Sequence, residues 1–220
     1  MPETRSAEAL GAIRLLMLSG EWQPGATFSE VKLAEDLGIS RTPIREAVAE
    51  LVSAGIVEKT PGSALRLRVM TAQDLEDAMD HRLVIERVAV EKLVRRRTRR
   101  LNQLRDVLEA AEEAIPDAPA GYLFNASEFH CMMSALACGH VSRHVLRPLI
   151  DIIYICGRGA LASEEFMRRD AVEHRRILEA MESAIADPLP DPSVALGHLT
   201  RHLDHMKQTI LGVGTISAAP

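Results

Sequence analysis

Aromatic residues are scarce in this chain: one Trp, two Tyr and four Phe make up only 3% of its 220 residues. The core must therefore be built from Leu, Ile, Val, Ala and Met, and hydrophobic residues as a whole reach 47%. Leu, Ala and Met are strong helix formers. With charged residues at 26%, this composition predicts a globular, mainly α-helical protein rather than a disordered one.

Cysteines and long apolar runs are also few. Cys131, Cys138 and Cys156 are odd in number and form no Cys-x-x-Cys pair, which favours free thiols in a reducing compartment. No apolar run approaches the ~18 residues of a membrane span. The first ten residues lack the basic-then-apolar layout of a signal peptide. We therefore expect a cytoplasmic protein that does not enter a membrane.

An excess of positive charge is absent as well, because the formal net charge is -5. Residues 1–70 hold 8 Lys and Arg against 9 Asp and Glu, and residues 71–220 hold 18 against 22. The net charge therefore gives no argument that this protein binds nucleic acid. A DNA-binding function must depend on where the cations lie rather than on how many there are.

The common catalytic motifs are missing too. The chain has no Gly-x-Ser-x-Gly elbow, no P-loop and no dinucleotide-binding Gly-x-Gly-x-x-Gly motif. His198 and His202 have the spacing of a zinc-protease helix, but Leu199 stands where the general-base Glu is expected. An enzyme is therefore not favoured, although a metal-dependent enzyme remains the alternative.

Residues 1–70 show the pattern of a winged helix-turn-helix domain. Apolar residues at helical spacing predict a helix over 7–19 and two short helices joined by a tight turn. Ser29 and Ser40 are natural N-caps of those two helices, and Gly38 is suited to end the first. The alternating stretches 56–59 and 65–69 flank the turn Thr60-Pro61-Gly62-Ser63, which predicts a small β-hairpin.

Residues 71–220 show a different pattern, with helical segments of 18 to 27 residues, several of them separated by Pro- or Gly-containing breaks. Thr71 and Asp74 form a capping-box pattern at the start of the first segment. The fold class expected for the whole chain is therefore mainly α. A winged helix-turn-helix domain of three helices and a hairpin precedes an antiparallel bundle of six to seven helices.

The start of the third helix concentrates cations and small polar groups: Ser40, Arg41, Thr42 and Arg45. In a helix-turn-helix, the N-terminus of the second helix enters the major groove. Arginine can donate two hydrogen bonds to guanine, and free N–H groups with Ser or Thr hydroxyls can hold phosphate. From spacing alone, a helix start whose arginines pair with Glu46 and Glu50 is an equal alternative.

The stretch 24–62 closely resembles the winged helix-turn-helix of the GntR family of bacterial transcription regulators. The matching positions are Pro24-Gly25, Glu30, Leu33-Ala34, Leu37-Gly38, Ser40-Arg41-Thr42-Pro43, Arg45-Glu46-Ala47, Leu51 and Gly55. The helical remainder resembles the effector-binding and dimerisation domain, called FCD, of the FadR-like branch. Together the two resemblances cover about residues 7–210.

The resemblance implies a homodimer that binds a palindromic operator of a metabolic operon, most often as a repressor that a small organic acid releases. It implies that Arg41 and Arg45 read the operator and that Gly62 in the wing lies close to the DNA. Relatives often carry an arginine where this chain has Val31, and Lys32 is the neighbouring candidate. A DNA-binding protein that responds to no ligand is a further alternative.

A set of histidines is the second candidate site. Metal-binding FCD relatives carry histidines that match His130, His174 and His202, with an Asp four residues before the first, where this chain has Ala126. The resemblance therefore implies a three-histidine site for a divalent metal, Zn or Ni, whose open positions take water or an effector carboxylate. His198 is the substitute for His202, and a site without metal is the competing interpretation.

Arg82 is the third candidate. In FCD domains an arginine at this place often faces the ligand cavity, and a guanidinium can bind a carboxylate with two hydrogen bonds. Arg143 and Arg158 are further candidates for binding the effector. The alternative for Arg82 is a surface ion pair with Glu86, which lies four residues further along the same helix.

Overall fold

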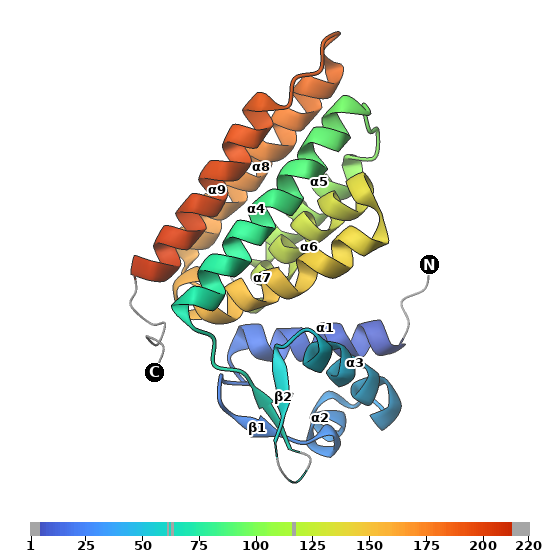
Figure 1. Cartoon of the computed structure of the whole chain (residues 1–220), viewed down its shortest axis with the longest axis vertical. Coiled ribbons are helices and arrows are strands. Elements are labelled where there is room, and N and C mark those ends of the chain that lie inside the picture. The colour runs from blue at the N-terminus through green and yellow to red at the C-terminus, as the bar shows by residue number, and fades with distance from the viewer. Residues whose placement is uncertain (1–4, 61, 63, 116–117, 213–220) are drawn as a thin grey trace. The chain divides into compact units, whose positions relative to one another are not determined.

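Three helices and a small antiparallel sheet make up the described part of the first unit of the chain, Met1–Met70 (Figure 1). The helices are α1 (Arg5–Ser19), α2 (Glu30–Leu37) and α3 (Arg41–Ser53), and the strands are β1 (Thr27–Phe28), β2 (Val57–Lys59) and β3 (Leu65–Leu67). The computed structural model describes residues 5–60, 62, 64–115 and 118–212, so Pro61 and Ser63 of the predicted turn lie outside the described residues.

The turn between α2 and α3 is built by local chemistry. The hydroxyl of Ser29 accepts a hydrogen bond from the Lys32 backbone N–H and begins α2. Gly38 ends α2 with φ of 65°, a left-handed conformation that favours glycine. Leu33 of α2 and Ile44 of α3 are fully buried, so the two short helices are held by their shared apolar side, as the sequence pattern predicts.

The sheet contains one strand more than the sequence analysis predicted. Its order is β1-β3-β2, with all pairs antiparallel. The hairpin of β2 and β3 was expected. Strand β1 has only two residues, which is too short for alternation to show. Its second residue, Phe28, packs edge-on against the buried ring of Trp22 at 4.8 Å between ring centroids.

Six helices make up the described part of the second unit, Thr71–Pro220. They are α4 (Ala72–Arg95), α5 (Asn102–Ala114), α6 (Pro119–Cys138), α7 (His140–Leu161), α8 (Glu164–Ala186) and α9 (Ser193–Gly212). Thr71 and Asp74 form the predicted capping box at the start of α4. Helix α4, green in Figure 1, contacts α6, α7, α8 and α9 and is thus central to the bundle.

The predicted fold class is therefore confirmed, with three helices and a small sheet followed by a helical bundle. The bundle brings α4, α6, α8 and α9 around one interior, and these helices carry the histidines and Arg82. Across the described residues, no helix combines the length and apolarity that crossing a membrane would require.

Candidate functional site

The start of α3 has polar groups that the fold leaves unused. Ser40 occupies the N-cap position with extended backbone angles, but its side chain makes no capping hydrogen bond, in contrast to Ser29. The first N–H groups of a helix lack partners within the helix and carry partial positive charge. The Ser40 hydroxyl and these N–H groups therefore form a patch that can bind an anion such as phosphate.

Arg41 and Arg45 project from this helix start and are exposed. Within the described residues neither guanidinium has an ion pair, and Glu50 lies 3.9 Å from Arg14 instead. The alternative in which these arginines pair with Glu46 and Glu50 is therefore not what the structure contains. Together with Thr42 and Glu30, the two arginines line a recess of about 230 Å³.

The other residues predicted to bind DNA are placed differently. The Lys32 ammonium lies 2.5 Å from the Asp36 carboxylate, one helical turn along α2, so this cation is already paired. Val31 is 43% exposed and offers no cation. Gly62 has φ of 85°, which a side chain would strain, and it lies at the tip of the hairpin.

In the bundle interior three histidines converge from three helices. His130 of α6, His174 of α8 and His202 of α9 are at most 1% exposed. The Nε2 atoms of His130 and His174 are 2.7 Å apart, and the ring of His202 stacks on that of His130 at 5.1 Å between centroids. One nitrogen from each ring lies within 4.8 Å of the others, which is close enough for all three to bind one ion.

A carboxylate group lies close to the Nδ1 atom of each of these three rings. Nδ1 of His130 lies 2.7 Å from Glu86, and Nδ1 of His202 lies 3.2 Å from Glu173. Nδ1 of His174 is 3.3 Å from Asp170, but it is not aligned for a hydrogen bond. Metal-binding histidines in proteins commonly donate their second N–H to a carboxylate in this way.

Burial keeps all three imidazoles neutral. It lowers the pKa of His174 to about 3, with the Arg82 guanidinium as the next cause. Burial and then Arg82 hold the pKa of His130 well below its ordinary value. Burial and then His174 lower the pKa of His202, against the opposing effect of Glu173. The neutral imidazole is the form that binds a metal ion, so the cluster is ready for one at physiological pH.

Five buried polar atoms of the described residues lack a hydrogen bond: Arg82 Nη2, Tyr154 Oη, Asp170 Oδ1, His174 Nδ1 and His202 Nε2. Such atoms are costly and rare, and they indicate a missing partner. His202 Nε2 would be satisfied by a cation shared with the other two histidines. The donor set, three neutral imidazoles with carboxylates behind them, fits Zn or Ni.

Comparisons with known proteins identify the two parts of the chain. Residues 5–67 match the family described as bacterial regulatory proteins, gntR family, and residues 77–189 match the FCD domain. The chain belongs to the GntR family and carries an FCD domain. It is therefore a transcriptional regulator and not an enzyme.

Several full-length relatives of this GntR-family regulator are known. The Nta operon transcriptional regulator of Aminobacter aminovorans is 29% identical, over 91% of this chain and 93% of its own length. A probable D-xylose utilization operon transcriptional repressor of Paenarthrobacter nicotinovorans is 27% identical, over 98% and 93%. The solved structure of E. coli McbR/YncC has the same fold, with a TM-score of 0.77 and 19% identity over 96% of this chain and 99% of that one.

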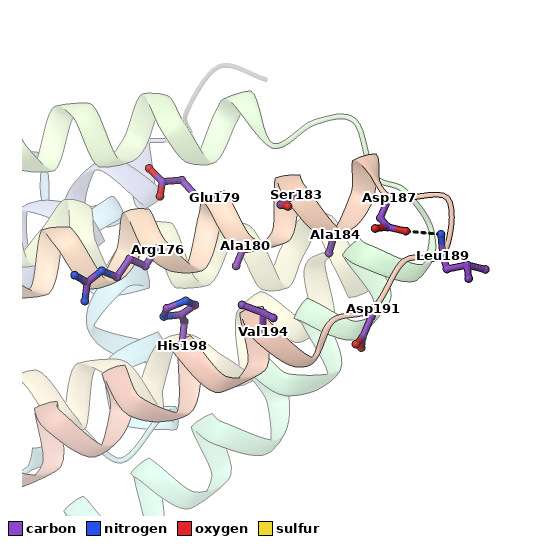
Figure 2. Close-up of a pocket in the computed structure, with 10 residues that line it drawn as sticks. All are labelled: Arg176, Glu179, Ala180, Ser183, Ala184, Asp187, Leu189, Asp191, Val194 and His198. Atoms are coloured by element: carbon purple, nitrogen blue, oxygen red, sulfur yellow. Dashed lines mark hydrogen bonds between the residues drawn. The ribbon is translucent and has the colours of Figure 1, made fainter.

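His198 lies apart from the cluster of His130, His174 and His202. It lines a separate recess of about 410 Å³ between α8 and α9, together with Arg176 and Val194, as Figure 2 shows. Its Nδ1 is 3.0 Å from an Arg201 nitrogen. The structure thus joins His202, and not the substitute His198, to His130 and His174, because one helical turn on α9 separates the two environments.

Arg82 forms the ion pair with Glu86 that the sequence left open, but the pair lies in the interior of the bundle. Arg82 is fully buried rather than part of a surface pair, and its Nε lies 2.5 Å from Glu86. One terminal nitrogen contacts the Met206 sulfur at 3.4 Å, and only Nη2 has no partner. Arg82 can therefore offer its unpartnered Nη2 toward an anion while Nε stays on Glu86, and a second bond from Nη1 would require only the loss of the Met206 contact.

The other two effector candidates, Arg143 and Arg158, both lie on α7. Arg143 on α7 donates to Glu128 on α6 at 2.6 Å, and Glu128 also binds the buried guanidinium of Arg147. Arg158 is half-buried near the end of α7. Arg143 therefore connects α7 to α6 through Glu128, and the role of Arg143 and Arg158 in binding an effector stays a prediction.

Sequence reasoning missed the carboxylates around the histidines. Asp170 and His174 are four residues apart on α8, a spacing that places two side chains on one helix face and could have revealed Asp170. Asp170 also accepts a hydrogen bond from Tyr122 at 2.6 Å. Burial raises its pKa, and His202 and Tyr122 only partly oppose that rise. Glu86 was considered only as a partner of Arg82, because nothing in the sequence shows that it also reaches His130.

Proposed function

We propose that this chain is a homodimeric, ligand-responsive repressor of a metabolic operon, which binds a palindromic operator and is released by a small organic acid. The observation that carries the DNA-binding part is the exposed, unpaired state of Arg41 and Arg45 at the start of α3, beside a serine whose hydroxyl is not used as a cap. The family match supports the same function. Since DNA is the partner, the protein is expected to act in the cytoplasm.

In this proposal the guanidiniums of Arg41 and Arg45 donate to guanine edges in the major groove. The Ser40 and Thr42 hydroxyls and the N-terminal N–H groups of α3 hold the adjacent phosphates and fix the register. Gly62 brings the wing backbone close to the DNA. Lys32 contributes less, because its ammonium is paired with Asp36.

The helical domain is proposed to sense the effector at the three-histidine site. His130, His174 and His202 would hold Zn or Ni, which would supply a Lewis-acidic position for a carboxylate oxygen. Arg82 Nη2 and the Tyr154 hydroxyl, both buried and without partners, are the groups available to bind the same acid. Different affinities of the acid for two dimer geometries would shift DNA binding.

The DNA-binding proposal is tested by fluorescence anisotropy. The wild-type chain selects a duplex from a random library, and its affinity is compared with that for a scrambled duplex. Arg41→Ala and Arg45→Ala are each expected to lose about 10- to 100-fold for the selected duplex, the usual range for a guanine contact. Arg168→Ala removes an equal charge from an exposed site on α8 and serves as the control. Wild-type affinity in both test variants would refute the assignment.

The metal proposal is tested by elemental analysis after incubation with zinc or nickel and removal of unbound ions. About one ion per chain is expected for the wild type and for His198→Ala, since His198 lies outside the cluster. His130→Ala is expected to lose the ion. If the wild-type chain holds none, the regulator would have to respond to its ligand without a metal, or to no ligand at all.

A further inference from the structure

Glu86 lies between two residues that the proposed function uses separately. One carboxylate oxygen accepts from Nε of Arg82 at 2.5 Å, and the other accepts from Nδ1 of His130 at 2.7 Å. All three side chains are fully buried, and they come from α4 and α6. A single carboxylate therefore connects the buried arginine to the histidine cluster.

The hydrogen bond from His130 determines which of its nitrogens carries the proton. A neutral imidazole has one N–H and one lone pair. A carboxylate paired with a guanidinium acts as an acceptor on both oxygens, so Nδ1 of His130 must be the donor. The lone pair is then on Nε2, which lies 2.7 Å from Nε2 of His174 and faces the interior of the cluster.

Glu173 and Asp170, the other two carboxylates near the histidines, are less suited than Glu86 to fix the orientation of an imidazole ring. Glu173 is shared between His202 and His205, and it is only half-buried. Asp170 lies 3.3 Å from His174 without the alignment of a hydrogen bond. Among the described carboxylates around the cluster, Glu86 thus combines full burial with a well-formed bond to a histidine.

We propose that Glu86 is the positioning residue of the three-histidine site and that it couples metal occupancy to Arg82. This inference rests on the proposed metal site. A cation on Nε2 makes Nδ1–H of His130 a stronger donor, which draws Glu86 toward His130 and loosens its bond to Arg82. The guanidinium is then freer to take an anion, so metal and anion assist each other's binding, as linkage requires.

The first test is nitrogen-15 NMR of the imidazole and guanidinium groups of the full chain. In the metal-free wild type His130 is expected to be the Nδ1–H tautomer, and the Nε2–H tautomer would overturn the proposal. Zinc is expected to shift the Nε–H resonance of Arg82. If that resonance stays in place while zinc binds, the coupling to Arg82 is wrong. This test needs no variant, so it holds even if a substitution at Glu86 fails to fold.

The second test is zinc affinity, measured by competition with a chelating dye, in Glu86→Gln. A Gln side chain keeps the shape, but one of its two ends is a donor, so it can no longer accept from both Arg82 and His130. The zinc dissociation constant is expected to rise 10- to 100-fold, the usual effect of losing such a partner. The rise in Tm on adding zinc should shrink accordingly.

Glu128→Gln is the matched control, because it disturbs another Arg–Glu contact of the same domain at a carboxylate that makes no described contact with the histidines. It should lower Tm without changing zinc affinity. Equal zinc affinity in Glu86→Gln and the wild type would overturn the role proposed for Glu86, while the proposal of a metal site would still hold. Absence of zinc binding in the wild type would overturn the metal site itself, and the inference with it.

Discussion

At the scale of single residues, the buried histidines make the helical domain sensitive to acid. The pKa of each of His130, His174 and His202 is lowered in the folded chain, so below about pH 6.5 the unfolded chain binds protons that the folded chain refuses. Stability contributed by these groups is therefore present above that pH and is lost as the pH falls. Asp170, whose pKa is raised, acts in the opposite direction, but only above its ordinary value near 4.

We predict that the free energy of unfolding of the metal-free chain falls as the pH is lowered from 7.5 to 5.5, with the steepest fall below pH 6, where the unfolded histidines take up protons. Urea unfolding at several pH values measures this. His198→Ala should keep most of this pH dependence, because it leaves the three buried histidines in place and removes only a partly exposed one outside the cluster. A stability that does not change over this range would contradict the neutral, buried state of the three rings.

At the scale of secondary-structure elements, the N-termini of α2, α3 and α4 differ in how they are capped. Thr71 and Ser29 accept hydrogen bonds from the backbone of α4 and α2, whereas Ser40 makes no capping bond in α3. We predict that Thr71→Ala and Ser29→Ala each cost about 1 kcal/mol of stability, and that Ser40→Ala costs less than about 0.5 kcal/mol. Thermal unfolding measures all three, and a large loss in Ser40→Ala would show that its hydroxyl has a structural role.

The packing of α7 against α9 gives a second prediction at this scale. A Cβ on Gly157 would lie 2.5 Å from Cγ1 of the buried Ile210, while a Cβ on Gly159 would meet nothing within 4 Å. Gly157→Ala should therefore destabilise the chain by about 1–3 kcal/mol through overpacking. Gly159→Ala should stabilise it by up to about 1 kcal/mol, since Ala is the better helix former. Chemical denaturation compares the pair, and equal effects would refute the close approach.

At the scale of the whole molecule, charge is divided unevenly along the chain. Residues 1–70 carry a formal charge of -1 and residues 71–220 carry -4, while Lys32 and Arg66 are already paired with Asp36 and Glu58. Few cations are left to neutralise phosphates. DNA recognition in this regulator must therefore depend on a few well-placed side chains rather than on bulk attraction.

This division predicts weak binding to scrambled DNA with a shallow salt dependence. Each neutralised phosphate contributes about 0.9 to the slope of log affinity against log salt, and we expect a slope shallower than about -6. Anisotropy titrations at several salt concentrations give the value. A much steeper slope would contradict this prediction. It would mean that many more cations contact phosphates than Arg41, Arg45 and a few neighbouring side chains.

Much of the architecture could be predicted from the chain alone. Capping residues, breakers and apolar periodicity specify each helix through contacts within a few residues, so the helix-turn-helix, the hairpin and the bundle helices were all foreseen. Strand β1 was missed because a two-residue strand exists only through its pairing with β3. The histidines that converge, His130, His174 and His202, were foreseen from the family resemblance.

The sequence by itself determined the helices, the cationic helix start and the candidate histidines, because these depend on neighbours along the chain. Tertiary structure alone decided that His202 rather than His198 joins the cluster, that Arg82 is buried, and that Glu86 bonds to His130 across 44 positions. Such contacts depend on which faces of four helices meet. The rotation of each helix is set by packing against the others, and no local pattern encodes it.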